Sequence, residues 1–176
     1  MMNRDIIVFM AGFPGAGKSH VIRFALNKLT DYDVNVINPK EYRRSEYDMF
    51  SEEEKREEDL CAWELSLDDL RDRLEEESKE TIIFDTACAT LRIMKKYFQL
   101  AEKHKRKIIY CFVHAPIATC KKRMSNRNIN DKIWKEYANK FKESVPELMK
   151  LSDHSIIINN SGEDINVDEL INLLKE

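Results

Sequence analysis

The stretch AGFPGAGKSH, residues 11–20, constrains this chain more than any other part of its sequence. It fits the pattern G-x-x-x-x-G-K-[ST], after a short apolar run at residues 6–10 and before a helical pattern at residues 18–29. In that context, backbone N–H groups of the loop converge on phosphate oxygens, the lysine reaches the β- and γ-phosphates, and the hydroxyl ligates Mg²⁺. The sequence therefore predicts a site for ATP and Mg²⁺, with Ser19 as a metal ligand. The candidate binding residues are Gly12, Pro14, Gly15, Ala16, Gly17, Lys18, Ser19 and His20.

Short apolar runs rich in β-branched residues alternate with longer segments of helical period along the whole chain. Strands separated by helices imply a parallel sheet that is covered on both faces. We therefore predict an α/β fold of three layers with a parallel five-stranded sheet, formed by residues 1–176 as a single domain. The predicted strands lie at residues 6–10, 34–37, 81–84, 107–113 and 155–158.

Composition is that of a globular protein, with 43% hydrophobic and 35% charged residues. Because every apolar run is far too short to span a bilayer, we expect no membrane partner. The apolar run near the start lacks a small-residue cleavage site, so we expect no signal peptide and a cytoplasmic location. Four widely spaced cysteines predict reduced thiols rather than disulfides or a zinc site.

Charge is distributed unevenly, although the net charge of the chain is only −3. Residues 51–80 carry 14 acidic and 5 basic side chains, whereas residues 116–142 carry 8 basic and 2 acidic ones. We interpret the basic segment as a lid that suits a polyanion such as ATP, with an ordinary solvated helix face as the alternative.

The acidic segment, residues 51–80, is expected to form a helical insert before the third strand. Ser51 and Glu54 have the spacing of a capping box. An apolar stripe follows at alternating spacings of three and four, which favours packing on the core over a dimer seam, because a coiled coil needs more heptads. The stripe consists of Leu60, Trp63, Leu67, Leu70 and Leu74.

The third predicted strand ends in IIFDT, which places Asp85 at its carboxyl end. An acid at this edge of a parallel sheet, beside the phosphate loop, is positioned to hold Mg²⁺ through water. The alternative is a capping role for the helix that begins near Thr90.

Two arginines, Arg123 and Arg127, lie four residues apart within the basic segment. Two guanidinium groups on one helix face can clamp transferring phosphates and stabilise charge in the transition state. A solvated basic face is the alternative explanation.

Taken in order, these motifs resemble the P-loop kinases of the polynucleotide kinase and zeta-toxin group. The resemblance is carried by GFPGAGKS, NPKEYRR at residues 38–44, IIFDT, the Arg123/Arg127 pair and SIIINNSG at residues 155–162. It implies a nucleotide kinase-like P-loop fold with an arginine-bearing lid, and ATP-dependent transfer to a hydroxyl group.

The resemblance also raises a question about the residue that receives the proton of the acceptor hydroxyl. Polynucleotide kinases carry N-x-D-D-x-R after the second strand, where the first Asp activates the hydroxyl and the Arg orients it. Here Asn38 and Arg43 match, Lys40 replaces the activating acid, and Glu41 falls on the second acid. A shift of one residue instead pairs Glu41 with Arg44. We predict Glu41 as the base, with either arginine as its partner.

Lys40 has two further interpretations. It could bind an anionic group on the acceptor, or it could be an exposed lysine without a role. In SIIINNSG, the resemblance implies that Asn159 and Asn160 hydrogen-bond the adenine base, although a plain strand and turn explain the same letters.

The leading functional hypothesis is a kinase that phosphorylates a hydroxyl of a nucleoside, a nucleotide or a polynucleotide end, so its partners would include ATP and nucleotides or nucleic acid. One alternative is a zeta-toxin-like kinase of a sugar nucleotide or another small metabolite. The other alternative is an ATP-binding module without transfer activity. The residues predicted to act in transfer are Lys18, Glu41, Arg43, Asp85, Arg123 and Arg127.

Overall fold

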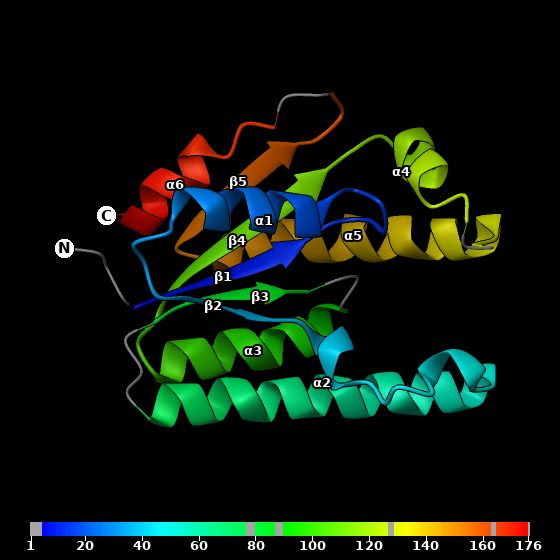
Figure 1. Cartoon of the computed structure of the whole chain (residues 1–176), viewed down its shortest axis with the longest axis horizontal. Coiled ribbons are helices and arrows are strands. Elements are labelled where there is room, and N and C mark those ends of the chain that lie inside the picture. The colour runs from blue at the N-terminus through cyan, green and yellow to red at the C-terminus, as the bar shows by residue number, and fades with distance from the viewer. Residues whose placement is uncertain (1–4, 77–79, 87–89, 127–128, 163–164, 176) are drawn as a thin grey trace.

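The computed structural model describes residues 5–76, 80–86, 90–126, 129–162 and 165–175. Its sheet has five strands, all parallel, in the order β2-β3-β1-β4-β5 (Figure 1). This confirms the predicted parallel five-stranded sheet. The strands are β1 (Ile6–Ala11), β2 (Val34–Ile37), β3 (Thr81–Asp85), β4 (Lys107–His114) and β5 (His154–Asn159).

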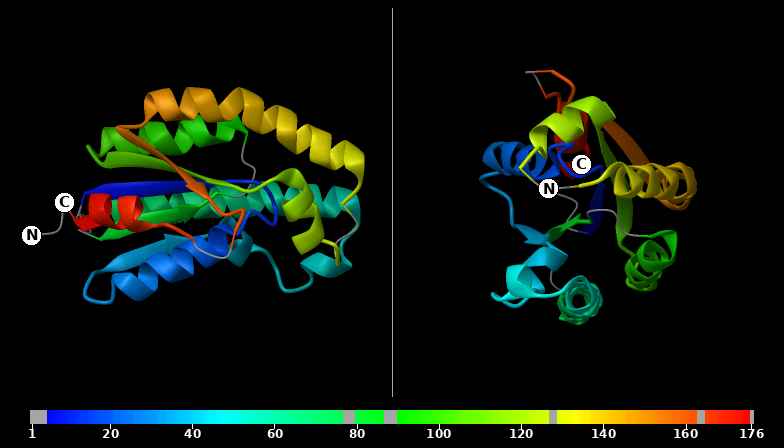
Figure 2. Two further views of the ribbon diagram at one scale, coloured as in Figure 1. Left: turned by 90° about the horizontal axis from the view of Figure 1, so that it is seen from above. Right: turned by 90° about the vertical axis from the view of Figure 1, so that its right-hand side faces the viewer.

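Helices cover both faces of the sheet and complete the predicted three layers. Helices α1 and α6 lie together on one face, α3 and α5 lie together on the other, and α2 runs along α3 (Figure 2). The helices are α1 (Lys18–Lys28), α2 (Glu52–Glu75), α3 (Leu91–Lys103), α4 (Ile117–Arg123), α5 (Asp131–Leu151) and α6 (Asp168–Lys175), and the short 3₁₀ helices are η1 (Pro39–Tyr42) and η2 (Tyr47–Met49). None of the helices in the described ranges combines the length and apolar character that crossing a bilayer requires.

The centre of the sheet explains why the apolar runs form strands. Every residue of β1 is buried, and β1 pairs with β3 on one side and β4 on the other. A strand that is covered on both faces has a continuous run of apolar residues rather than an alternation of apolar and polar residues. An aromatic cluster of Phe9, Phe84 and Phe98 with Tyr97 fills the space between the sheet and α3.

Helix α2 is a single helix of 24 residues, and its capping box of Ser51 and Glu54 forms as predicted. Leu67, Leu70 and Leu74 are buried, which agrees with the prediction that the stripe packs on the core. Leu60 is 60% exposed, so the prediction is wrong at that end of the stripe. The physical reason is that the first half of α2 extends past the carboxyl ends of the strands (Figure 1).

Candidate active site

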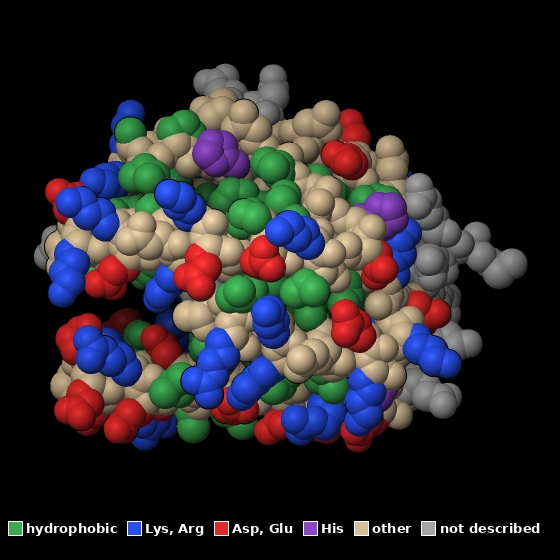
Figure 3. Space-filling model, turned by 180° about the vertical axis from the view of Figure 1, so that it is seen from behind, with side chains coloured by type: hydrophobic (Ala, Val, Ile, Leu, Met, Phe, Trp, Pro, Cys, Tyr) green, Lys and Arg blue, Asp and Glu red, His purple; other side chains and the backbone are tan. Residues whose placement is uncertain are grey.

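A cleft opens at the carboxyl ends of the strands, where α2 and α5 both project beyond the sheet. Figure 3 shows it as a deep notch at one edge of the molecule. The cleft contains a cavity of about 570 Å³ whose lining comes from the phosphate loop, the two 3₁₀ helices, α2, the end of β3 and the α4–α5 region. The lining residues are Pro14, Gly15, Gly17, Lys18, Ser19, His20, Asn38, Lys40, Arg43, Tyr47, Asp59, Trp63, Asp85, Met124, Ile129 and Tyr137.

The phosphate loop requires glycine at Gly17, which precedes the first residue of α1. Its φ is 94°, in the left-handed region that favours glycine. A Cβ atom added there would collide with the side-chain amide of Asn160. The geometry therefore explains the glycine before the lysine by backbone conformation and by close packing.

Lys18 lies at the start of α1 with its ammonium group over the loop. Its Nζ donates to the carbonyl oxygen of Gly12 at 2.9 Å and to that of Phe13 at 3.4 Å. The ammonium group thus sits at the N-terminus of the helix, where backbone N–H groups and the helix dipole favour an anion. This arrangement suits the β- and γ-phosphates of a nucleotide.

Two predicted ligand-binding side chains contact the loop backbone. The Asn160 Nδ2 donates to the carbonyl oxygen of Ala16 at 2.7 Å, and the residue is buried. Arg123 donates from Nη1 to the Gly15 carbonyl at 3.3 Å and from Nη2 to the Asn160 carbonyl at 3.2 Å. Both side chains therefore hold the loop in shape, and their predicted contacts with adenine and phosphate stay predictions. Arg127 lies outside the described residues.

Asp85 stands at the end of β3, 6% exposed, and lines the cavity. Burial raises the pKa of its carboxyl group, and the charges of Lys18 and Lys40 and the hydroxyl of Ser19 oppose part of that rise. Asn38 Nδ2 donates to Asp85 Oδ2 at 3.3 Å, whereas Oδ1 has no hydrogen-bond partner among the described residues. An oxygen of this kind beside a serine hydroxyl fits Mg²⁺, which takes one or two protein oxygens, phosphates and water.

The alternative role of Asp85 as a helix cap does not apply. Thr90 is the N-cap of α3, and its side chain accepts from the backbone N–H of Ile93 at 3.4 Å. Within the described ranges no three His, Cys, Asp or Glu side chains cluster as a metal site. The donors for Mg²⁺ would therefore be few, as expected for an ion held mainly by nucleotide phosphates.

The segment after β2 shows which of its side chains face the cavity. Asn38 caps η1 by accepting from the backbone N–H of Lys40 at 3.1 Å, and Lys40 lines the cavity. Glu41 is exposed and is absent from the cavity lining. Its role as a base therefore stays a prediction that rests on the sequence pattern alone.

The two arginines of the same segment, Arg43 and Arg44, pair with different acids of α2. Arg43 lines the cavity, and its Nη2 lies 2.6 Å from Asp59 Oδ1. Arg44 instead pairs with Glu58, with Nε 2.9 Å from Oε2, and its guanidinium lies over the ring of Phe50. Of the two registers left open by the sequence, the one with Arg43 places its guanidinium in the cavity.

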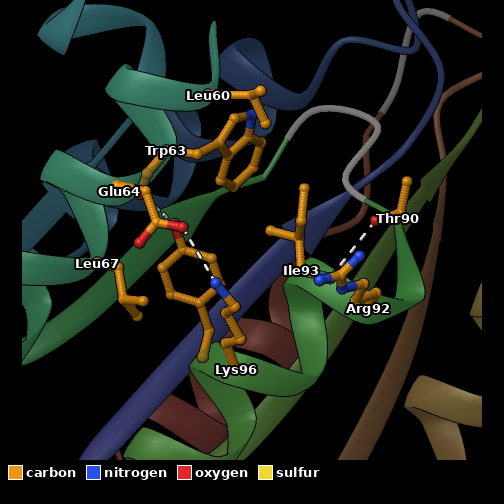
Figure 4. Close-up of a pocket in the computed structure, with 9 residues that line it drawn as sticks. Leu60, Trp63, Glu64, Leu67, Thr90, Arg92, Ile93 and Lys96 are labelled. Atoms are coloured by element: carbon orange, nitrogen blue, oxygen red, sulfur yellow. Dashed lines mark hydrogen bonds and ion pairs between the residues drawn. The ribbon is translucent and has the colours of Figure 1, made fainter. Parts of the chain in front are cut away.

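Asp59, Tyr47, Trp63 and Tyr137 line the cavity but were not among the predicted site residues. The only sequence signal was the spacing of Asp59 and Trp63, four residues apart and hence on one face of a helix. Trp63 also borders a smaller hollow of about 270 Å³ between α2 and α3, shown in Figure 4. There Lys96 Nζ lies 3.0 Å from Glu64 Oε1 and ties the two helices together.

Several solved structures are similar to this chain in fold. The structure is similar to a Chloroflexus aurantiacus protein provisionally described as a kinase, with 12% identity and a TM-score of 0.67 over 98% of this chain and 94% of that one. It is similar to a structure of the PezAT chromosomal toxin–antitoxin system of Streptococcus pneumoniae, with 16% identity and a TM-score of 0.64 over 97% and 77%. Shikimate kinase from Acinetobacter baumannii gives 15% identity and a TM-score of 0.58 over 95% and 89%.

At these identities the solved structures show a shared fold. Among curated proteins, no sequence matches this chain. The sequence does match a family model described as AAA domain over residues 7–148, which is most of its length. The chain therefore belongs to the AAA domain family, and its fold is that of the P-loop kinases.

Proposed function

We propose that this protein is an ATP-dependent phosphotransferase that moves the γ-phosphoryl group to a hydroxyl of a nucleoside, a nucleotide or a polynucleotide end. The observation that carries the proposal is the shared cavity. Its lining includes Lys18, Ser19 and Asp85 from the phosphate loop and the end of β3, together with Arg43, which follows η1, and Trp63 of α2. A donor site and an acceptor site that open into one cavity allow direct transfer between two bound molecules.

On the donor side, Lys18 would bind the β- and γ-phosphates, and Ser19 and Asp85 would hold Mg²⁺. Mg²⁺ held by these residues would supply positive charge that offsets the negative charge developing on the transferring phosphate. Arg123 would stabilise that charge together with Arg127. The contacts of Arg123 with the Gly15 carbonyl keep its guanidinium beside the loop, which supports this role.

On the acceptor side, Arg43 would orient the hydroxyl and Glu41 is the base predicted from the sequence. Lys40 would place a positive charge beside the reacting groups, because it lines the cavity and its charge acts on Asp85. Positive charge there favours an acceptor that carries its own anionic group.

We expect Asp85→Asn to lower kcat by about 10–100-fold and to raise the Mg²⁺ concentration needed for half-maximal rate. The same change should raise the melting temperature, because it removes a carboxylate that burial disfavours. Transfer rates at several Mg²⁺ concentrations and thermal unfolding check both expectations. Asp33→Asn, an exposed acid before β2 at the opposite end of the sheet, is the matched control. An unchanged Mg²⁺ requirement would remove Asp85 from the metal site.

A kinase of a sugar nucleotide or another small metabolite is the second candidate. It is favoured by α2, a cavity wall whose first turn carries the exposed acids Glu52, Glu53 and Glu54. Such a wall repels a long polyanionic strand. The two candidates differ in salt dependence, since binding of a polynucleotide weakens steeply with salt and binding of a small acceptor does not.

The test of the proposed function is an acceptor panel with terminally labelled ATP. The panel holds 5′-hydroxyl DNA and RNA, modified-base DNA, nucleosides, nucleotides and sugar nucleotides. We expect the label to appear on a nucleoside, nucleotide or polynucleotide acceptor. Label on a sugar nucleotide instead would favour the second candidate, and ATP binding without any labelled product would indicate a binding module.

A further inference from the structure

A carboxylate from α2 lines the cavity together with Lys40 of the segment after β2. Asp59 lines the same cavity as Lys18 and Asp85. It lies one helical turn before Trp63, whose ring is stacked on Phe84 with centroids 6.3 Å apart. Phe84 directly precedes Asp85 in β3, so the packing of this helix sets Asp59 at the edge of the sheet where transfer would occur.

Two neighbours hold the Asp59 carboxylate in place. Arg43 Nη2 lies 2.6 Å from Oδ1 in an ion pair whose angles fall outside those of a hydrogen bond. The Tyr47 hydroxyl donates to Oδ2 at 3.3 Å, and the Arg43 guanidinium also lies 4.2 Å from the centre of the Tyr47 ring. Arg43, which directly follows η1, Tyr47 of η2 and Asp59 of α2 therefore form one connected unit.

The carboxylate still has capacity to bind a further donor. Oδ1 is buried against Arg43, whereas the bond from Tyr47 at 3.3 Å is the one hydrogen bond resolved for Oδ2 among the described residues, and 37% of the Asp59 side chain is exposed. Each carboxylate oxygen can accept two hydrogen bonds. An acceptor hydroxyl could therefore donate to Oδ2 beside the long bond from Tyr47.

We propose that Asp59 supplies the acid that Lys40 displaces, and that it binds and deprotonates the acceptor hydroxyl. This inference rests on the proposed function. In the step, the hydroxyl oxygen forms a bond to the γ-phosphorus, and the bond from that phosphorus to the β,γ-bridging oxygen breaks to release ADP. The hydroxyl proton passes to an oxygen of Asp59 and then to water.

The other carboxylates of the region suit this role less well. Glu41 is exposed and does not line the cavity. Asp85 is nearly fully buried beside Lys18 and Ser19, which suits a metal ligand. Two acids held in different environments can divide two tasks between them. Asp59 would serve the acceptor and Asp85 the metal.

The experiment measures transfer by the wild type to its best acceptor from the panel and then repeats it with Asp59→Asn. General bases contribute about 10²–10⁴-fold to rate, so we expect kcat to fall by that factor while the KM values for ATP and acceptor change little. Asp68→Asn is the control, since it is an exposed acid on α2 that pairs only with Arg71 among the contacts resolved for it. Binding of a non-hydrolysable ATP analogue, measured by calorimetry, verifies that each variant is folded.

Three outcomes would overturn the inference. The first is a wild-type kcat for Asp59→Asn together with a large loss for Glu41→Gln, which would return the role to Glu41. The second is a raised acceptor KM with an unchanged kcat, which would mean that Asp59 only positions Arg43. In both cases the proposed function stands. Absence of transfer by the wild type to every acceptor would overturn the proposed function and this inference together.

Discussion

We expect Lys18→Ala to reduce the rate of phosphoryl transfer by at least about 10²–10³-fold, because it removes a preorganised positive charge from the transferring phosphates. ATP binding should weaken as well, since the ammonium group sits at the helix N-terminus where the triphosphate is expected. A smaller effect on folding follows from the lost bonds of Lys18 Nζ to the carbonyls of Gly12 and Phe13. We expect that loss to be about 1 kcal/mol. Transfer rates, calorimetry with an ATP analogue and denaturant unfolding separate the three effects.

The matched control for this change is Lys28→Ala. Lys28 ends the same helix, is exposed, and pairs with Asp168 at 3.1 Å across the surface. Exposed ion pairs contribute little to stability, so activity and unfolding should stay close to those of the wild type. Equal losses in the two variants, or full activity in Lys18→Ala, would contradict the assignment of the phosphate loop.

Gly17→Ala is the second change with a large expected effect. A non-glycine residue at a φ of 94° costs about 1–3 kcal/mol. The new methyl group would also collide with the amide of Asn160, which must move and lose its 2.7 Å bond to the Ala16 carbonyl. Since that bond holds the loop in shape, we expect loss of ATP-analogue binding in addition to lower stability.

Gly162→Ala is the control for Gly17→Ala, because it replaces a glycine by alanine at a position without the same steric conflict. A Cβ atom added at Gly162 would have no atom of the described residues within 4 Å. Calorimetric binding and denaturant unfolding should therefore be close to those of the wild type. Gly17→Ala with wild-type affinity for the ATP analogue would show that the loop does not need this conformation to hold a nucleotide.

The fold was predictable because its signals are local. The phosphate loop is a contiguous motif, the capping box of α2 spans four residues, and the buried strands are apolar runs whose length distinguishes them from helices. No strand end differs from its predicted position by more than one residue, and such a shift occurs at the end of β4 (Lys107–His114) and at both ends of β5 (His154–Asn159). Parallel order then follows from the alternation of strands and helices.

The acceptor side was less predictable because it depends on how separate segments dock. Whether Arg43 or Arg44 faces the cavity is decided by Glu58 of α2, which takes Arg44 away from it. Asp59 lines the cavity because α2 is docked there, through the packing of Trp63 on Phe84 and the pairing of Arg44 with Glu58. Asn160 could be predicted as a site residue from its position after the last strand. Its hydrogen bond to the Ala16 carbonyl could not be predicted, because the two residues lie far apart in the sequence.

The most direct measurement of the central claim is a crystal structure with Mg²⁺ and a non-hydrolysable ATP analogue. We predict that the triphosphate binds the backbone of residues 12–19, with Lys18 on the β- and γ-phosphates, the metal between Ser19 and Asp85, and the terminal phosphorus facing Asp59 and Arg43. A nucleotide bound elsewhere, or a terminal phosphate turned away from that cavity, would contradict it.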